Sequence, residues 1–317
     1  MPLSAFGWSD DQQIEFRPFA DAGLLPGRIV GEHRTHYQVA TEVGELTAEL
    51  AGRVRNDANE RSDLPGVGDF VGLRLSQGSG PAIVETRLAR QSAIIRKAAG
   101  ETRPQLIASN VDVVFIVTAL DGDFNLERLQ RYLTLITDGH ALPVIIINKA
   151  DIATGLEQAV GQLDKMAPEV PRHVISARDS TDVACLERYF EGNKTIALVG
   201  SSGVGKSTMT NQLLGEDIQR TQAVRGHDNR GRHTTTHRQL FVRRRGGLIM
   251  DTPGMRGLEL WEAEEDVSSD RFADIDALAT QCKFRNCRHD TEPKCAVRAA
   301  IERGDLSPEH LAQYNAR

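Results

Sequence analysis

The stretch that decides the fold is Thr195-Ile-Ala-Leu-Val-Gly200-Ser-Ser-Gly-Val-Gly205-Lys206-Ser207-Thr208. An apolar run leads into a glycine-rich loop, and a helical sequence follows. This order of strand, loop and helix is the context that the phosphate-binding motif G-x-x-x-x-G-K-S requires. Glycines allow backbone N–H groups to close around phosphate oxygens at the start of a helix. The predicted phosphate-binding residues are Gly200, Ser201, Ser202, Gly203, Val204, Gly205, Lys206, Ser207 and Thr208.

A magnesium ion is expected beside this loop. The hydroxyl of Ser207 is predicted to bind Mg²⁺ directly. Asp251 follows the apolar run 247–250, and its carboxylate is predicted to hold the ion through water. A threonine from the polar segment between these two positions would complete the magnesium shell. The sequence favours Thr234 or Thr235 and does not choose between them.

The base is predicted to be guanine. The sequence Asn148-Lys149-Ala-Asp151 follows the apolar run 143–147. A carboxylate at Asp151 can accept hydrogen bonds from the ring N–H and the exocyclic amine of guanine, which adenine does not present. The motif alone is also typical of a polar turn after a strand, but a backbone N–H of the later Ser176-Ala177 would meet guanine O6. The predicted base-binding residues are Asn148, Lys149, Asp151, Ser176 and Ala177.

The phosphate loop comes after the guanine tetrad, whereas ordinary small GTPases have the opposite order. This inversion predicts a circularly permuted GTPase. The segment that starts at Asp251 would be the second switch, and it leads through residues 255–265 directly to a cysteine-rich end. Loss of γ-phosphate contacts would therefore be transmitted to that end by direct covalent connection.

Hydrolysis is predicted to be slow without a partner. Lys206 is expected to reach the β and γ phosphates, and the N–H of Gly254 to sense the γ-phosphate. Met255 stands where many GTPases carry the glutamine that orients the attacking water, and a thioether cannot do this. His233 is the best internal candidate for the missing group, although an exposed loop histidine without a role fits equally well. An arginine of residues 225–232, or a group from a partner, stays open.

Three of the four cysteines lie in one short C-terminal stretch, in the pattern Cys282-x4-Cys287-x-His289-x5-Cys295. Three thiolates and one imidazole are enough for a closed tetrahedral zinc site. Because no coordination position is left open, the zinc is expected to be structural and to hold a small domain together.

Short β-rich runs alternate with turn residues between about residues 27 and 87. Five such runs, at 28–31, 37–40, 46–50, 69–73 and 82–86, predict a small barrel. The turn Leu64-Pro-Gly-Val-Gly-Asp69 favours an OB-type barrel, although periodicity does not distinguish it from an SH3-like one. Aromatic residues make up 5% of the chain, so RNA binding by the barrel would rest mainly on phosphates.

Near-continuous apolar runs alternate with amphipathic segments from about residue 105 onward, which predicts a doubly wound α/β domain. The expected class is multidomain α/β: an OB-like barrel, a circularly permuted P-loop GTPase domain and a zinc-binding helical domain. The expected parts are an N-terminal extension (1–22), the barrel (23–97), the GTPase domain (98–260) and the zinc-binding domain (261–317).

The net charge of −6 argues against a nucleic-acid partner, but the charge is uneven. Residues 203–256 hold ten cations and four anions, a local excess of +6. Residues 1–19 have no apolar core flanked by basic residues, and no long apolar run follows. Together with the few cysteines, this predicts a cytoplasmic protein that does not enter a membrane.

These motifs in this order resemble the family of ribosome small-subunit-dependent GTPase A proteins, called RsgA or YjeQ, over nearly the whole chain. The resemblance implies a GTPase that uses GTP/GDP, Mg²⁺ and one structural Zn²⁺. It also implies binding to the small ribosomal subunit late in its maturation, rRNA contacts through the barrel and the zinc domain, and activation by the subunit. The segment from Gly231 to Thr235 resembles the family's first switch, which supports His233. We expect a monomer.

Two other classes of protein compete with this interpretation. A metabolic P-loop enzyme or kinase would need a phosphoryl-acceptor pocket, which the sequence does not show, and would leave the guanine tetrad without a role. A nucleotide-regulated RNA-binding scaffold with negligible turnover is compatible with Met255. Partner-stimulated GTP hydrolysis separates the scaffold from the GTPase.

Overall fold

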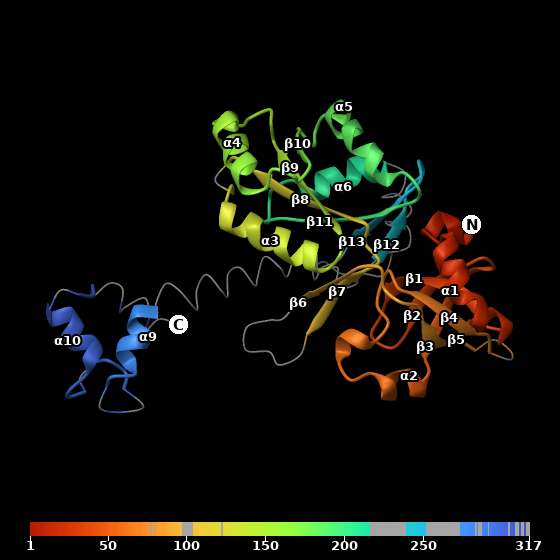
Figure 1. Cartoon of the computed structure of the whole chain (residues 1–317), viewed down its shortest axis with the longest axis horizontal. Coiled ribbons are helices and arrows are strands. Elements are labelled where there is room, and N and C mark those ends of the chain that lie inside the picture. Colours follow the sequence, from red (N-terminus) through yellow and green to blue (C-terminus); the bar gives the residue numbers. More distant parts are fainter. Residues whose placement is uncertain are drawn as a thin grey trace, which may run out of the picture. The chain divides into compact units, whose positions relative to one another are not determined.

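The computed structural model describes residues 1–76, 78, 80–96, 104–121, 123–215, 239–251, 273–282, 284, 287–290, 292–303, 305–307, 311 and 314. The chain divides into two compact units, residues 1–259 and residues 260–317. Figure 1 labels their helices and strands. The predicted site residues His233, Thr234, Thr235 and Gly254 lie outside the described residues.

A closed five-stranded barrel forms the N-terminal part of the first unit. Neighbouring strands pair in the order β1-β2-β3-β5-β4, and β4 pairs back with β1, so no edge is left within the ring. This closed arrangement fits the OB-type barrel. Each predicted β-rich run overlaps one of its strands, and only Asp69 of the run 69–73 lies outside, just before β4. The strands are β1 (Leu25–Glu32), β2 (Tyr37–Thr41), β3 (Gly44–Leu50), β4 (Phe70–Arg74) and β5 (Ala82–Arg87).

The N-terminal segment folds against this barrel, although the sequence predicts no element there. It forms η1 (Leu3–Phe6) and α1 (Asp10–Asp21), and Ser9 with Gln12 makes a capping box at the start of α1. The ring of Trp8 meets the ring of Phe70 edge to face, with centroids 5.5 Å apart. Apolar packing onto the barrel therefore orders a segment whose overall composition is polar.

A mostly parallel sheet forms the rest of the first unit. Its order is β10-β9-β8-β11-β13-β12, and only β12 runs antiparallel to its neighbour in this set. The strands are β8 (Val113–Ala119), β9 (Leu142–Asn148), β10 (Arg172–Val174), β11 (Thr195–Val199), β12 (Gln239–Val242) and β13 (Leu248–Asp251). The sequence identified most of these runs, but not β12.

Helices cover this sheet because its strands are apolar on both faces. Phe115 and Val117 of β8 belong to a buried cluster that includes Phe190 and Met209. The helix α3 also packs on this sheet, where it contacts β8 and β9. The helices are α3 (Leu126–Asp138), α4 (Leu156–Met166), α5 (Ser180–Val183), η3 (Ala184–Phe190) and α6 (Lys206–Leu214). The predicted doubly wound α/β domain is thus confirmed.

Smaller elements lie within the barrel and between the barrel and this sheet. A two-stranded hairpin is made of β6 (Ala93–Arg96) and β7 (Gln105–Ser109). Between β3 and β4 lie α2 (Gly52–Asp57) and η2 (Arg61–Asp63). The hairpin bridges the barrel and the mostly parallel sheet, since β7 contacts η2 and β6 contacts α3.

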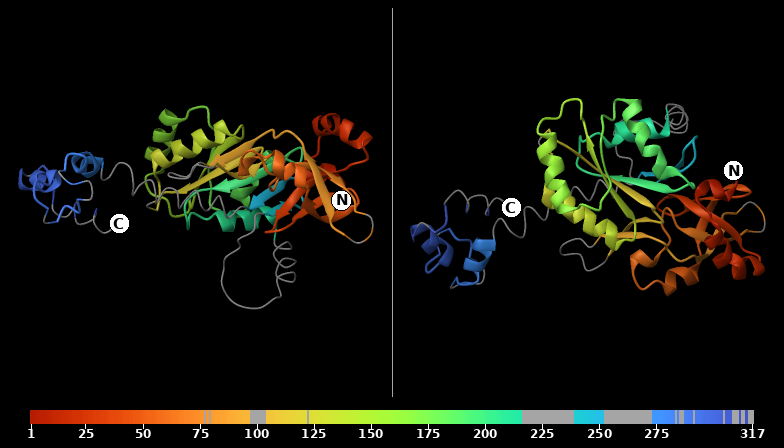
Figure 2. Two further views of the ribbon diagram at one scale, coloured as in Figure 1. Left: turned by 90° about the horizontal axis from the view of Figure 1, so that it is seen from below. Right: turned by 45° about the horizontal axis from the view of Figure 1, so that its top comes forward.

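The barrel and the mostly parallel sheet are continuous through one strand pair. Gly31 of β1 pairs with Gln239 of β12, which makes a single sheet of 11 strands. Arg28 of β1 is 1% exposed, and its guanidinium donates hydrogen bonds to the carbonyl oxygens of Phe6, Gly68 and Asn110. Figure 2 shows the red and orange barrel directly beside the green sheet in both views. The two predicted domains therefore form one folded body.

The second unit contains α9 (Ala273–Ala279) and α10 (Ala296–Arg303), which contact each other. Their small core includes Ile275, Val297 and Ala300, and three cysteine side chains pack on or in it. In the part of the chain with described structure, no helix is both long enough and apolar enough to cross a bilayer.

Candidate nucleotide-binding and metal sites

The glycine-rich loop runs from the end of β11 to the start of α6, as predicted. Gly200, Gly203 and Gly205 all have positive φ angles, of 136°, 81° and 102°. Two of them also allow a close approach: an added Cβ would lie 2.0 Å from the Val117 oxygen at Gly200 and 2.2 Å from the Asn148 amide nitrogen at Gly205. The local backbone needs glycine at these positions, so the loop keeps its curved form.

Lys206 and Ser201 show that this curved loop fits phosphate. The Lys206 ammonium donates hydrogen bonds to the carbonyl oxygen of Gly200 and, at 2.6 Å, to that of Ser201. The Ser201 hydroxyl is buried and has no hydrogen-bond partner among the described residues. A buried polar atom without a partner is costly, and a phosphate oxygen would satisfy it. The loop thus has both an ammonium and a hydroxyl ready for an anion.

Asn148 connects this loop to the segment predicted to read guanine. Its side-chain amide donates a hydrogen bond of 2.7 Å to the carbonyl oxygen of Val204. Its amide oxygen accepts one of 2.8 Å from the N–H of Ala177. The side chain is buried at the end of β9. Both ends of the amide are therefore used to hold the two loops together.

The predicted base-binding residues line one cleft of about 250 Å³. Its walls come from the end of β9, the loop after β10, and the glycine-rich loop with the start of α6. These segments all follow the carboxyl ends of parallel strands. The structure thus brings the guanine tetrad, Ser176-Ala177 and the phosphate loop together. The lining residues are Asn148, Lys149, Asp151, Ile152, Ser176, Ala177, Arg178, Gly203, Gly205 and Thr208.

Lys149 takes a backbone conformation that is uncommon for a residue with a side chain, with φ of 61°. Its ammonium lies 2.5 Å from the carboxylate of Asp121, which follows β8. The hydrogen bond from Lys149 lowers the pKa of Asp121 below its usual value. Asp121 thus fixes the direction of Lys149 along one wall of the cleft.

Asp182 holds the loop that contains Ser176 and Ala177. Its carboxylate accepts a hydrogen bond of 2.8 Å from the N–H of Ser176. One backbone N–H of the Ser176-Ala177 pair is predicted to meet guanine O6. Since the N–H of Ala177 bonds Asn148, the N–H groups of both residues already have partners inside the protein. The next N–H along the chain belongs to Arg178, whose residue lines the cleft.

The sequence analysis does not identify Asp121, Asp182 or Arg178. Asp121 and Asp182 act on other residues of the site through contacts 28 and 6 positions away. Arg178 directly follows the predicted Ser176-Ala177 pair, so its position next to the motif is the one available signal.

Asp251, predicted to hold magnesium, is the last residue of β13. This strand is the parallel neighbour of β11, and Ala197 pairs with Met250. Because the phosphate loop follows β11, Asp251 lies at the same edge of the sheet as the loop.

The four predicted zinc ligands come together in the second unit, where their ligand atoms all lie within 4.8 Å of one another. The Sγ atoms of Cys282 and Cys295 are 3.8 Å apart, and Nδ1 of His289 lies 3.6 Å and 3.4 Å from them. A tetrahedral zinc ion with Zn–S of about 2.3 Å and Zn–N of about 2.05 Å requires separations of about 3.8 Å and about 3.5 Å. The donor atoms of Cys282, Cys287, His289 and Cys295 therefore fit zinc.

Backbone geometry and charge support the same conclusion for this cluster. His289 and Lys294, which precedes Cys295, have φ angles of 61° and 60°. Burial opposes ionisation of the Cys282 thiol, but hydrogen bonds from backbone N–H groups bring its pKa below the usual value. Burial and the neighbouring thiols raise the pKa of Cys287 to about 11. Thiolates this close repel one another, so the cluster fits a bound cation.

Comparison with known proteins gives consistent results. The family model described as RsgA GTPase matches residues 87–261. A protein of Opitutus terrae named "Small ribosomal subunit biogenesis GTPase RsgA" is 41% identical, with 99% of this chain and 88% of that protein covered. A protein of the same name from Xanthomonas axonopodis pv. citri is 46% identical, with 92% and 79% covered.

Two solved structures share the fold. The crystal structure of YjeQ from Thermotoga maritima superposes with a TM-score of 0.55 at 24% identity, and covers 92% of this chain and 96% of its own. The structure of YloQ, described as a circularly permuted GTPase, has a TM-score of 0.52 at 24% identity, with 92% and 94% covered. The predicted circular permutation is thereby confirmed.

Proposed function

The chain belongs to the RsgA family of GTP-hydrolysing enzymes, and we propose that it binds the small ribosomal subunit late in the maturation of that subunit, which stimulates its hydrolysis of GTP. The observation that carries this proposal is the pair of hydrogen bonds through which Asn148 holds the phosphate loop and the Ser176-Ala177 loop around one cleft. The small ribosomal subunit is proposed as the partner because the relatives carry it in their names.

Within the cleft, Asp151 selects guanine through its carboxylate, as the sequence predicts. The N–H of Arg178 is the donor to guanine O6, because those of Ser176 and Ala177 bond Asp182 and Asn148. The aliphatic stem of Lys149, directed by Asp121, covers one face of the base. Each role depends on a side chain or N–H that lines the described cleft.

At the phosphate end, Lys206 exchanges its bonds to the carbonyl oxygens of Gly200 and Ser201 for bonds to phosphate oxygens. Ser207 and Asp251 hold the magnesium ion, together with Thr234 or Thr235. Magnesium neutralises the charge that develops on the phosphates during hydrolysis. Gly254 contacts the γ-phosphate through its N–H, and His233 orients the attacking water in place of the missing glutamine at Met255.

The barrel and the zinc-binding unit contact rRNA in this proposal, and the zinc is structural. The basic residues Arg288, Lys294 and Arg298 lie near the zinc ligands and suit a phosphate-facing surface. We place the protein in the cytoplasm as a monomer. The proposed domains are the N-terminal extension (1–22), the barrel (23–97), the GTPase domain (98–260) and the zinc-binding domain (261–317).

Cosedimentation with purified small ribosomal subunits tests the partner. The full chain should travel with small subunits in the presence of a non-hydrolysable GTP analogue, and less of it with GDP, because the γ-phosphate contacts differ between the two states. Purified large subunits serve as the matched control. Equal recovery with both subunits, or with neither, would remove the small subunit as the specific partner.

A further inference from the structure

We propose that Arg243 is a positioning residue for the magnesium site: it ties the far end of helix α6 to the turn before β13, and so fixes Ser207 relative to Asp251. This inference rests on the proposed function, in which Ser207 and Asp251 hold the ion. The contacts of Arg243 themselves are ones that the proposed function does not use.

Arg243 differs from the two arginines that follow it. In the sequence, Arg243, Arg244 and Arg245 all belong to the basic stretch of residues 203–256. In the structure Arg243 is 3% exposed, whereas Arg244 and Arg245 are exposed. Burial of a guanidinium is costly unless hydrogen bonds and a counter-charge compensate for the lost water. The burial of this one arginine is therefore explained by the partners it meets inside the protein.

The guanidinium of Arg243 meets acceptors from three parts of the first unit. Its Nε donates a hydrogen bond of 2.7 Å to the carbonyl oxygen of Leu213, in the last turn of α6. Its Nη2 donates one of 2.6 Å to the carboxylate of Glu187 in η3, and its Nη1 donates one of 3.2 Å to the carbonyl oxygen of Gly246. The group also lies over the ring of Phe190, 3.7 Å from the centroid. These contacts fix both the place and the orientation of the planar guanidinium.

The bond to Leu213 acts on the helix that follows the glycine-rich loop. Leu213 lies near the C-terminal end of α6, where the last four carbonyl groups lack partners within the helix and carry a partial negative charge. A cation is favourable at this end. Ser207 lies six residues earlier on the same helix, about 9 Å away at about 1.5 Å per residue. Arg243 therefore holds a short helix at the end opposite to Ser207.

The turn around Gly246 leads into the strand that ends at Asp251. The N–H of Arg243 donates a hydrogen bond of 2.9 Å to the carbonyl oxygen of Gly247, and β13 begins at the next residue, Leu248. Asp251 follows three residues later, about 10 Å along the strand at about 3.3 Å per residue. The two residues proposed to hold magnesium thus lie at the ends of two short elements, and Arg243 joins the other ends of both.

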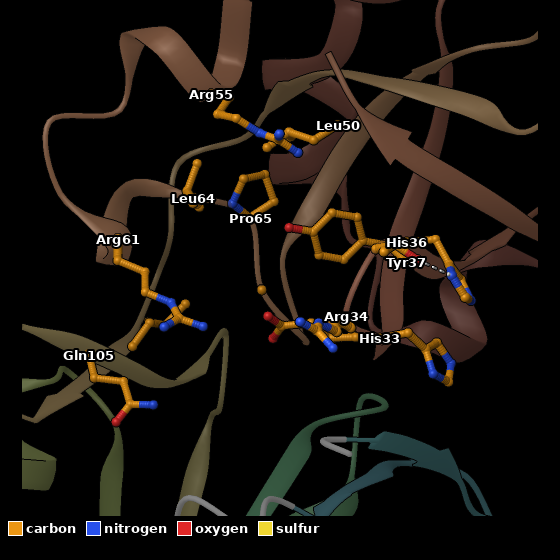
Figure 3. Close-up of a pocket in the computed structure, with 14 residues that line it drawn as sticks. His33, Arg34, His36, Tyr37, Leu50, Arg55, Arg61, Leu64, Pro65 and Gln105 are labelled. Atoms are coloured by element: carbon orange, nitrogen blue, oxygen red, sulfur yellow. Dashed lines mark hydrogen bonds between the residues drawn. The ribbon is translucent and has the colours of Figure 1, made fainter. Parts of the chain in front are cut away.

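The strand β12, which leads to Arg243, is fixed at its start. Gln239 of β12 pairs with Gly31 of β1. Gly31 lies just before the hairpin on which Figure 3 labels His33 and Arg34, so β12 extends from the barrel to the turn that begins with Arg243. This turn is therefore anchored on one side by the barrel, which makes it a firm base for α6.

A purely structural role of Arg243 predicts a different outcome from a positioning role. Buried ion pairs can often be replaced by apolar residues with little loss of stability, because the attraction mainly offsets the cost of burial. If Arg243 only stabilised the fold, a folded variant would bind magnesium as well as the wild type does. If it positions α6, a folded variant would need more magnesium, while the guanine cleft, which Arg243 does not line, would keep its affinity.

Release of a fluorescent GDP analogue from the full chain, measured over a range of Mg²⁺ concentrations, tests the proposal. Magnesium that holds the phosphates stabilises the bound state and slows release, so the concentration for half of this effect reports its affinity. Arg243→Met should raise this concentration about fivefold or more, because loss of a residue that supports metal ligands weakens metal binding. Affinity for the analogue in EDTA should stay within about twofold of wild type.

Arg245→Met is the matched control. The side chain of Arg245 is 79% exposed and lies 3.9 Å from the same Glu187 carboxylate, without the contacts to α6. Its replacement should leave the magnesium requirement unchanged. An unchanged requirement in Arg243→Met that is folded by circular dichroism would overturn the proposal, and so would an equal rise in Arg245→Met.

Arg243→Lys keeps the test decisive if the methionine variant does not fold. Lysine retains the positive charge, but its compact ammonium does not span the acceptors that the guanidinium fork reaches. The magnesium requirement should therefore still rise, about threefold. The wild-type requirement in Arg243→Lys would refute the positioning role.

Ser207→Ala separates this inference from failure of the proposed function. If Ser207 binds magnesium, loss of its hydroxyl should raise the magnesium requirement in the same assay. No change in Ser207→Ala would remove the proposed magnesium site itself. A rise in Ser207→Ala without a rise in Arg243→Met would leave that site in place and refute only the role of Arg243.

Discussion

The side-chain amide of Asn148 donates a hydrogen bond of 2.7 Å to the carbonyl oxygen of Val204, so the segment predicted to read guanine and the glycine-rich loop share one buried contact. The two segments are 56 positions apart in the chain. Because the same amide also accepts from Ala177, removal of the side chain would leave two buried backbone groups without partners. In the proposed function, this contact would couple base recognition to phosphate binding.

Asn148→Ala should lower both stability and nucleotide affinity. Two unsatisfied backbone groups should reduce the free energy of unfolding by about 1–3 kcal/mol. Binding of a fluorescent GDP analogue should weaken about tenfold or more, because neither loop is held in place. Asn56→Ala, at an exposed position on α2, should change neither quantity. Wild-type affinity in Asn148→Ala would contradict the coupling of the two loops.

Asp151→Asn should change base selection. In the proposed role, the carboxylate would accept two hydrogen bonds from guanine, whereas an amide would offer a donor to the same edge and suit xanthine. Affinity for GDP should fall at least about a hundredfold, and affinity for xanthosine diphosphate should rise. Asp138→Asn, an exposed change at the end of α3, is the matched control. Unchanged discrimination among guanine, xanthine and adenine nucleotides would reject the role of Asp151.

His233→Ala should slow hydrolysis while sparing binding. If His233 orients the attacking water, turnover in the presence of small subunits should fall at least about tenfold, and the affinity for GTP should stay within twofold. His237→Ala removes a nearby histidine from the same segment and should have little effect. An unaltered rate in His233→Ala would assign the catalytic group to an arginine of residues 225–232 or to the subunit.

Cys287→Ala should release the metal and unfold only the second unit. Structural zinc contributes directly to folding of small domains, and this unit has a core of few apolar residues. Metal analysis should show about one zinc per wild-type chain and far less in the variant, with GDP affinity retained. Cys185→Ala is the control, because Cys185 lies outside the cluster. Full zinc content in purified Cys287→Ala would refute this ligand set.

Arg28→Met should destabilise the first unit by about 3 kcal/mol or more. The guanidinium donates to three backbone carbonyl oxygens. Methionine would remove this donor from the oxygens of Phe6 and Asn110, whereas the oxygen of Gly68 would keep the bond from the Asn110 amide. Burial lowers the pKa of Arg28 to about 10, so the group is still charged at neutral pH. Thermal unfolding measures the change, with Arg17→Met at an exposed position of α1 as the control. Equal melting temperatures for both variants would contradict the proposal that the hydrogen bonds of Arg28 stabilise the first unit.

Local patterns predicted much of this structure. The five barrel strands, the phosphate loop and the strands β8, β9 and β11 all carry their signal within a few consecutive residues. The zinc ligands have a spacing that depends little on the rest of the fold, and the four side chains meet as expected. These features could be predicted because the residues that form each of them are close together in the sequence.

Other features depend on partners that are distant in the chain. The helix α1 is ordered by contacts such as that of Trp8 with Phe70, 62 residues later. The strand β12 pairs with β1 across about 200 residues, and the contact of Asn148 with Val204 spans 56. Periodicity reports on residues that are close in the sequence, so a single sequence gives no sign of contacts between such distant residues.

The most direct test of the account is steady-state hydrolysis of GTP and ATP by the full chain, alone and with purified small or large ribosomal subunits. The account predicts slow GTP turnover alone, strong stimulation by small subunits, little effect of large subunits and negligible use of ATP. Lys206→Ala should abolish the stimulated rate, which excludes contaminating activity. Turnover of ATP, or GTP turnover that neither subunit changes, would contradict the account.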